Sequence, residues 1–435
     1  MWLRSSRMGQ QTRPSAGPSK PRPLEITFGK ETEAMNPVRQ RLLFECHSIF
    51  CKTQSVALAS KGELRVDDAM ILSQRYRLSI RNAVRMADQM DLPQAQKQQI
   101  ADELLSTEII WSLFEAVSIR PTNHSIVVDL IEWGRECFSS AADVLATVME
   151  EISCMQSNEK PERHELYWNA LIQQVLSGDF KSASNLLKFH SKYETDGAFQ
   201  KMAMIFQKID TGLQRDRTNC DEFVEGQREI RELVQTGMLR QHDNLNFIYA
   251  ILRGQKVAFM KCSQTLAINW YELLPAYVLF CHPAAKPHQI GKIAEDLFAF
   301  SEKSKDDLPV LDKTLFSILS LDCLEALRKI CSCGSSSWWF ATHLIDLLYY
   351  HDPSVLGNDI FSSSSQMGLR TRILVEYASS LFSTKELWEI AADYLMASGA
   401  EEVVQMLEER VSELDWQGNT QLAERIILMC GKYDW

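Results

Sequence analysis

Glycine and proline are scarce in this chain, whose 435 residues include 18 glycines and 13 prolines. Folds made of many short strands need these residues at their frequent tight turns. Their scarcity argues against a β-sandwich or β-barrel and favours an all-α protein. Hydrophobic residues make up 45% and charged residues 24%, as in an ordinary soluble folded protein. The chain is too long for one compact core, so an elongated or repetitive core is expected.

Long apolar runs and metal-binding cysteine patterns are also absent. No uninterrupted apolar run approaches the roughly 18 residues of a membrane-spanning helix, which predicts no transmembrane segment. The eleven cysteines are scattered through apolar helical patterns, as at Cys46 and Cys430, which is typical of a reducing compartment. The nearest approach to a metal cluster, Cys323, Cys331 and Cys333, matches neither a zinc knuckle nor a zinc finger. We therefore predict no metal and no cofactor.

Local catalytic motifs are missing as well. The chain has no GxxxxGK[ST] phosphate loop, no GxGxxG turn, no HExxH and no GxSxG elbow. A sparse group, Cys281, His282 and His288, lies beside Pro283 and Pro287 and is interpreted as a loop between helices. We predict no catalytic residues and favour a scaffold or adaptor that binds other proteins. The alternative is a helical enzyme whose active site leaves no local motif.

Positive charge is concentrated at the N-terminus. Residues 1–23 hold five basic residues and no acidic one, among several prolines, serines and glycines. This composition predicts a disordered leader. A mitochondrial transit peptide, which is also rich in arginine and poor in acidic residues, is the alternative, but the prolines would disrupt the amphipathic helix that it needs. The remainder of the chain is acidic, which disfavours direct binding of nucleic acid and favours protein partners.

One short segment alternates apolar and polar residues as a strand does. Leu24, Ile26 and Phe28 share one face of such a strand, within a predicted strand and linker over 24–36. A single strand has no partner in this chain. It must stay disordered, lie on a helix or pair with the sheet edge of another protein, and in the last case these three side chains are the candidates for binding.

Helical periodicity runs from residue 37 to residue 435. Apolar residues recur there at three-and-four spacing, with Pro93 and Pro121 at two of the breaks. The clearest predicted helices span 39–57, 67–89, 94–119, 125–138 and 141–154.

A helical hairpin with a small-residue break recurs along the chain. The breaks are Ser177-Gly178-Asp179, Arg253-Gly254-Gln255 and Ser398-Gly399-Ala400. Glycine allows the first helix to end in a left-handed cap, and Asp179 can cap the helix that follows. Such hairpins bury their apolar faces by stacking on their neighbours, which predicts an irregular α-solenoid over 37–435. Tandem four-helix bundles are the alternative, but they predict no recurring break.

The segment 338–348 is apolar around most of a helix, so it must be buried on several sides. Trp338, Trp339 and, further on, Trp388 are the predicted core anchors. His343 lies three positions before Asp346, and these two residues could form a catalytic pair. A local hydrogen bond that satisfies a half-buried imidazole is the preferred interpretation.

Several segments, in order from about residue 24 to the C-terminus, resemble one known family. The most specific are the double-tryptophan helix 338–348 and the block 374–382, with the sequence LVEYASSLF, followed by Leu387-Trp388. Weaker support comes from 44–50, 108–115 and 129–133. Together they resemble the nucleoporin-85 family, the short-arm members of the Y-shaped scaffold complex of the nuclear pore.

This resemblance implies the ancestral coatomer element, in which helices run out to a crown, return along a trunk and continue into a tail. It implies a structural, non-enzymatic role in the outer ring of the pore, at the nuclear envelope, supporting transport of protein and mRNA. The implied partners are other Y-complex nucleoporins and a Sec13-like WD-repeat β-propeller. A vesicle-coat-like or other α-solenoid adaptor is the alternative.

The chain departs from the family pattern at both ends. Family members carry several strands before the first trunk helix, whereas only Leu24 to Phe28 resembles a strand here. Weak or lost propeller binding is therefore expected. Most of the tail is expected to be missing, and the last helix, with Leu422, Ile426, Ile427 and Met429, is expected to expose an apolar face.

Overall fold

The computed structural model describes most of the chain from residue 36 onward, and the described residues are helical apart from the turns and short connections that join the helices. No strand occurs among them, which confirms the predicted all-α class. The leader 1–23 and the predicted strand with Leu24, Ile26 and Phe28 lie outside the described residues. The described ranges are 36–120, 124–138, 140–155, 159–215, 226, 228–232, 237–239, 241–301, 308–332, 338–356, 368–384, 386–400, 402–414 and 416–433.

The first five helices begin and end close to the predicted boundaries. The third continues from Phe114 into one turn of π-helix, Glu115–Ile119, so the periodicity extends to residue 119 as expected. Asn36 caps the first helix, because its side-chain oxygen accepts a hydrogen bond from the Val38 amide at 2.9 Å. These helices are α1 (Pro37–Ala59), α2 (Val66–Gln89), α3 (Gln94–Phe114), α4 (Ile126–Cys137) and α5 (Ser140–Cys154).

The predicted hairpins with glycine breaks are confirmed. Gly178, Gly254 and Gly399 each have a positive φ, of 75°, 68° and 67°, at the end of the first helix of a pair. Asp179 caps the second helix of the first pair by accepting a hydrogen bond from the Ser182 amide at 3.0 Å. The three pairs are α6 (Tyr167–Leu176) with α7 (Phe180–Lys188), α10 (Asp243–Leu252) with α11 (Lys256–Leu266), and α18 (Trp388–Ala397) with α19 (Val403–Ser412).

The helices form two compact units, which are described separately. Unit 1 comprises residues 1–111, 309–314 and 323–435, and unit 2 comprises 112–308 and 315–322. The remaining helices are α8 (Gly197–Arg215), α12 (Trp270–Cys281), α13 (Pro287–Phe298), α14 (Val310–Leu319), α15 (Cys323–Cys331), α16 (Trp338–His351), α17 (Leu369–Phe382) and α20 (Thr420–Tyr433).

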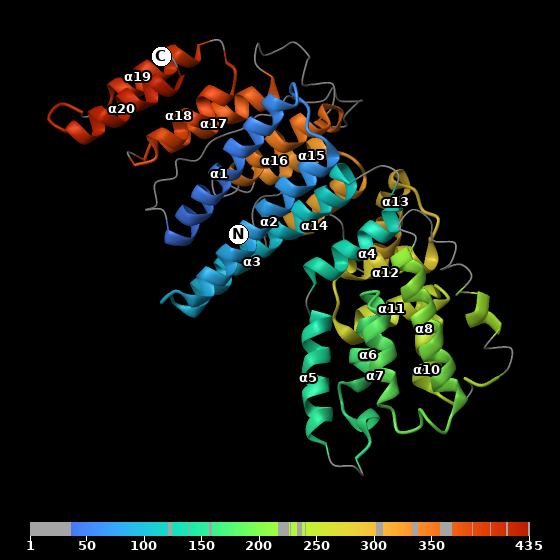
Figure 1. Cartoon of the computed structure of the whole chain (residues 1–435). Coiled ribbons are helices and arrows are strands. Elements are labelled where there is room, and N and C mark those ends of the chain that lie inside the picture. The colour runs from blue at the N-terminus through green and yellow to red at the C-terminus, as the bar shows by residue number, and fades with distance from the viewer. Residues whose placement is uncertain are drawn as a thin grey trace, which may run out of the picture. The chain divides into compact units, whose positions relative to one another are not determined.

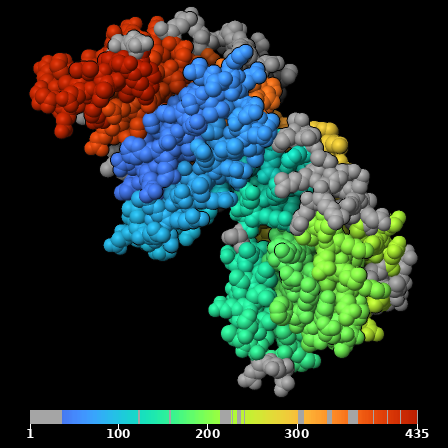
Figure 2. Space-filling model, in the orientation of Figure 1, coloured from blue at the N-terminus to red at the C-terminus, as the bar shows by residue number. Residues whose placement is uncertain are grey.

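Unit 1 joins the two ends of the helical chain. Helix α1 packs against α2, α16 and α18, so helices more than 250 residues apart in sequence share one core. Figure 1 shows α1 and α2 in blue beside α16 in orange, and the space-filling view in Figure 2 has the same blue and orange-red segments in contact. The core of unit 1 is therefore built from both ends of the described chain.

Unit 2 is built from hairpins in closer sequence order, and two glycines allow its helices to approach. A side chain at Gly134 of α4 would come within 2.9 Å of the Pro275 ring of α12. A side chain at Gly254 would come within 2.5 Å of the Phe280 carbonyl oxygen. Both contacts require glycine, because a Cβ atom cannot occupy either position without moving its neighbour.

Candidate functional site

Helix α16 is the centre of unit 1. Every residue from Phe340 to Leu348 is buried. The helix contacts α1, α2, α15 and α17, which confirms that it is buried on several sides. Three polar side chains, Thr342, His343 and Asp346, lie within this buried stretch and require partners there.

The predicted local pairing of His343 with Asp346 is not formed. His343 is fully buried rather than half-buried, and its Nδ1 donates to the Trp339 carbonyl one turn earlier. A carbonyl can only accept, so Nδ1 carries the proton and Nε2 accepts from the Tyr394 hydroxyl at 2.7 Å. Both ring nitrogens are thus occupied by structural partners. The catalytic interpretation of this pair has no geometric support.

Burial lowers the pKa of His343 to about 3, and the nearby His47 lowers it further, against the opposing hydrogen bond to Trp339. The rings around His343 are those of Phe50, Tyr76, Trp339, Tyr377 and Tyr394. The imidazole is therefore neutral in the folded protein at physiological pH.

We expect this histidine to make the fold acid-sensitive. Unfolded histidine titrates near 6.5, whereas folded His343 titrates near 3, so the unfolded chain binds the extra proton. The stabilisation is complete above pH 6.5 and is lost progressively as the pH falls toward 3. In denaturant unfolding, the free energy of unfolding should fall more steeply from about pH 7 to pH 4 for the wild type than for His343→Gln. Equal slopes would contradict the assignment.

Asp346 instead forms a buried ion pair with Arg370 of α17. The Arg370 Nε lies 2.8 Å from Asp346 Oδ1, and both side chains are buried. Gln54 of α1 donates to Asp346 Oδ2 at 2.7 Å and accepts from the second terminal nitrogen of Arg370 at 3.0 Å. Arg370 also donates to the Ala397 carbonyl at the end of α18, at 3.0 Å. One guanidinium thus connects four helices.

Two further features surround this ion pair. The Arg370 guanidinium lies 5.1 Å from the centre of the Tyr349 ring and 4.8 Å from that of Tyr350, within cation–π range. Burial raises the pKa of Asp346, while Arg370 and Gln54 oppose that rise. The site is a structural junction with every charged group paired.

The three predicted anchors differ in burial. Trp388 is 1% exposed, in the core of unit 1. Trp339 is half-buried, with its ring 6.0 Å from that of Phe340. The side chain of Trp338 lies outside the described part of the chain, although its backbone begins α16. Their role as anchors stays a prediction, and burial favours Trp388.

A second polar cluster in unit 1 escaped the sequence analysis. His47 and Cys51, one turn apart on α1, meet Asp393 of α18. The His47 Nε2 lies 3.0 Å from Asp393 Oδ2, and the Cys51 Sγ lies 3.3 Å from the same Nε2. The i, i+4 spacing of a histidine and a cysteine was the available signal. The third member, Asp393, lies 342 residues beyond Cys51, and no sequence pattern linked it to the other two.

Asp393 is the most connected member of this cluster. Its Oδ1 accepts hydrogen bonds from Lys432 Nζ at 2.7 Å and from the Tyr433 hydroxyl, both on α20. Burial alone would raise its pKa, but the hydrogen bonds from His47, Lys432 and Tyr433 lower it to about 2. Burial likewise disfavours charged His47, but the hydrogen bonds to Asp393 and Cys51 raise its pKa to about 9.

Helix α20 has an exposed apolar surface. Ile427 is 69% exposed and Leu428 is 73% exposed, whereas Met429 is buried against the protein. Leu422 and Ile426 are half-buried. The expected apolar face therefore exists, but it consists mainly of Ile427 and Leu428 rather than of the four residues predicted.

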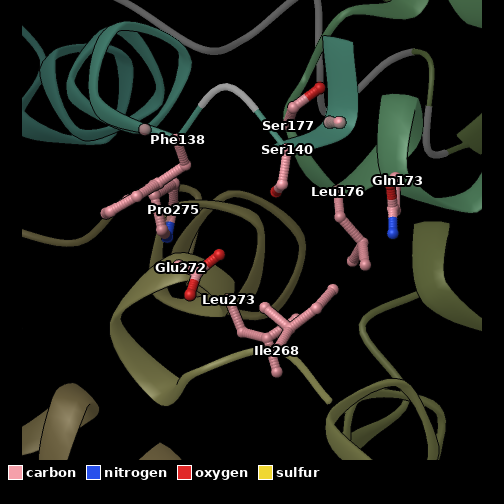
Figure 3. Close-up of a pocket in the computed structure, with 11 residues that line it drawn as sticks. Phe138, Ser140, Gln173, Leu176, Ser177, Ile268, Glu272, Leu273 and Pro275 are labelled. Carbon is pink, nitrogen blue, oxygen red and sulfur yellow. The ribbon is translucent and has the colours of Figure 1, made fainter. Parts of the chain in front are cut away.

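Unit 2 contains a small hollow where the loop between α4 and α5 meets α6 and α12. Figure 3 shows Phe138, Pro275, Leu273 and Ile268 around it. The hollow has a volume of about 30 Å³, which is room for water but not for an organic ligand. It therefore offers no substrate site.

A wider surface hollow lies over the connection between α12 and α13, and Cys281, His282 and His288 line it. Residues 282–286 connect the two helices, so the loop interpretation is confirmed for His282 and corrected for Cys281 and His288, which lie within α12 and α13. The Cys281 thiol donates to the Gly254 carbonyl at 3.3 Å, and burial raises its pKa to about 12. The thiol is thus a weak candidate for chemistry.

Among the helices that the structure describes, none has the length and apolar character needed to cross a membrane.

Comparisons with known proteins identify the family that this chain resembles. A family model described as Nup85 nucleoporin matches residues 26–435. The chain is 26% identical to the nuclear pore complex protein Nup85 of Bos taurus over 386 residues, covering 84% of this chain and 56% of that protein. It is 25% identical to Nup85 of Homo sapiens over 393 residues, covering 86% and 57%. Nup75 of Drosophila melanogaster is 23% identical over 414 residues, covering 86% and 56%.

The chain thus spans a little over half the length of the curated relatives it matches. The match nevertheless runs through all the described helices of both units, including the buried α16 and the hairpins with glycine breaks. On this evidence the chain belongs to the Nup85 nucleoporin family.

Proposed function

We propose that this protein is a structural scaffold component of the outer ring of the nuclear pore complex, located at the nuclear envelope, where it supports transport of protein and mRNA. The observation that carries the proposal is the family match over residues 26–435, because its relatives are nuclear pore complex proteins. The buried ion pair of Asp346 with Arg370, which connects four helices of unit 1, supports a structural role. Its partners on this proposal are other Y-complex nucleoporins, and it has no enzymatic activity.

The proposal is tested by location and by partners. A fluorescently tagged chain expressed in animal cells should form a rim at the nuclear envelope. Affinity purification from the same cells should recover other outer-ring nucleoporins. Tagged Arg370→Ala, in which the junction of four helices is broken, is the control for dependence on the fold. Recruitment to cytoplasmic vesicles in place of the rim would favour the coat-like adaptor instead.

The domain organisation enters the proposal as well. On the proposed organisation, residues 37–435 are the crown and trunk of the solenoid. The alternating apolar residues Leu24, Ile26 and Phe28 are the proposed contact with a Sec13-like WD-repeat propeller. Backbone pairing along one strand edge supplies the affinity and alternate side chains supply the specificity.

Propeller binding is expected to be weaker than in a relative with several such strands. At micromolar concentration, the chain and propeller should separate during gel filtration, and Ile26→Asp should weaken the residual binding seen by a more sensitive titration. The control is Glu25→Asp, which leaves the apolar face of the strand unchanged. A stoichiometric complex that survives gel filtration would contradict this expectation.

We propose that the apolar surface of α20 is covered by a helical hairpin of another nucleoporin. Ile427 and Leu428 are consecutive on this helix and are 69% and 73% exposed, and adjacent exposed apolar side chains of this kind are typical of an interaction surface. The adjacent Arg425–Glu389 ion pair, at 2.7 Å, gives the surface a polar rim.

The free protein is therefore expected to self-associate, and the double substitution of Ile427 and Leu428 by aspartate should leave it monomeric in analytical ultracentrifugation. Stability should change little, because both side chains are exposed. Val257→Asp is the matched control, since Val257 is 75% exposed on α11 of unit 2. A monomeric wild type would contradict this proposal. Equal loss of self-association in Val257→Asp would contradict it as well.

A further inference from the structure

Three side chains with different ligand atoms converge in unit 1. The His47 Nε2, Cys51 Sγ and Asp393 Oδ2 all lie within 4.8 Å of one another. The separations are 3.0 Å for nitrogen and oxygen, 3.3 Å for sulfur and nitrogen, and 3.9 Å for sulfur and oxygen.

In the absence of a metal ion, each side of this triangle is within hydrogen-bond range. A single ring nitrogen holds at most one hydrogen, which can be directed at the Asp393 oxygen or at the Cys51 sulfur but not well at both. At 3.9 Å, the Cys51 thiol is at the limit of hydrogen-bond range from Asp393. Three potential ligand atoms thus converge on one small region.

The spacing fits a tetrahedral zinc ion. Bonds of about 2.0–2.1 Å to nitrogen or oxygen and 2.3 Å to sulfur give ligand separations of about 3.3–3.6 Å at tetrahedral angles. The three observed separations bracket that range, so side-chain shifts of a few tenths of an ångström would complete it. His47 and Cys51 reach the same point because residues four apart lie on one face of a helix.

We propose that His47, Cys51 and Asp393 bind a zinc ion, with a water molecule as the fourth ligand. A thiolate with an imidazole suits zinc, whereas magnesium and calcium prefer oxygen ligands alone. On binding, His47 and Cys51 each release a proton to solvent, so the imidazole coordinates in its neutral form and the sulfur as the thiolate. The side chains of His47 and Asp393 are 18% and 10% exposed, which leaves a path for the ion and for the water.

The surroundings of Asp393 are those that a metal ligand requires. Its second oxygen, Oδ1, is held by Lys432 and Tyr433, which leaves Oδ2 directed at that region. The Tyr394 ring, 5.6 Å from that of His47, limits the movement of the imidazole. Such outer partners orient the ligands and strengthen binding. The ion would link α1 directly to α18, and α20 through Asp393.

The proposal is tested by measuring the zinc content of the whole chain and its affinity for zinc. Protein purified without chelator should hold one equivalent of zinc by mass spectrometry of metals. Replacement with cobalt(II) should give a thiolate-to-cobalt charge-transfer band. Cys51→Ser and His47→Gln should each weaken zinc binding at least 10-fold, on the scale of ligand or outer-partner loss. Cys51→Ser should also remove the charge-transfer band. Cys154→Ser, at an exposed cysteine of α5, is the matched control and should change neither.

A loss of folding is separated from a loss of ligand by circular dichroism. Metal-free wild type and Cys51→Ser should have the same helical spectrum, and added zinc should raise the melting temperature of the wild type only. Absence of zinc from the wild type after reconstitution, or full zinc content in Cys51→Ser, would overturn the proposal. If Cys51→Ser fails to fold, Asp393→Asn provides the second variant. Full zinc content in that variant would also overturn it.

Discussion

Replacing Arg370 with alanine is expected to lower the free energy of unfolding by about 3–5 kcal/mol, the usual cost of removing one partner from a buried ion pair. The carboxylate of Asp346 would remain 1% exposed and without its counter-charge. The Gln54 side chain and the Ala397 carbonyl would each lose a donor as well. The effect should appear as a lower midpoint in denaturant unfolding.

Arg372→Ala is the matched control for this experiment. Arg372 lies on the same helix and pairs with Glu376 at 3.2 Å, but both side chains are partly exposed. Exposed pairs of this spacing contribute about 0.3–0.5 kcal/mol. The double variant Asp346→Leu with Arg370→Met should lose less than the sum of the single losses, because it leaves no unpaired charge. Equal effects of Arg370→Ala and Arg372→Ala would show that the junction is not buried in solution.

Replacing Trp388 with alanine is expected to cost about 3–5 kcal/mol, the range for a large aromatic removed from a core. Trp388 is among the largest fully buried side chains of the described residues. The cost has two parts, the lost transfer of the indole from water and the cavity that remains. Thermal or denaturant unfolding would measure it.

Two other tryptophans provide the comparison. Trp339 is half-buried, so Trp339→Ala should cost less than Trp388→Ala. Trp416 is 46% exposed, and Trp416→Ala should stay within about 0.5 kcal/mol of the wild type. An order of effects other than Trp388, Trp339, Trp416 would mean that burial does not determine which tryptophans anchor the core.

Local features of the fold were predictable from sequence because their causes are local. Three-and-four periodicity placed α1 to α5, and glycine with its freedom at positive φ marked the hairpins at Gly178, Gly254 and Gly399. Both signals arise within one or two helical turns. The same reasoning identified α16 as buried, since its apolar residues surround the helix.

Contacts between distant residues were not predictable in this way. His343 was paired with Asp346 on spacing alone. Its distant partner is instead Tyr394 of α18, beside the local Trp339 carbonyl, and Asp346 meets Arg370 of α17 and Gln54 of α1. The cluster of His47, Cys51 and Asp393 combines two residues with a recognisable spacing and a third that only the fold supplies. Periodicity states which face of a helix is buried, but not which helix covers it.

The discontinuity of unit 1 has a consequence for synthesis of the protein. Helix α1 emerges from the ribosome early, but the groups it meets, such as Asp346 and Asp393, follow about 300 residues later. At roughly 5–20 residues per second, α1 and α2 wait on the order of 15–60 seconds for these partners. Most of unit 2 is contiguous and can fold within that interval. The apolar faces of α1 and α2 are then the surface that a chaperone would have to protect until α16 and α18 arrive.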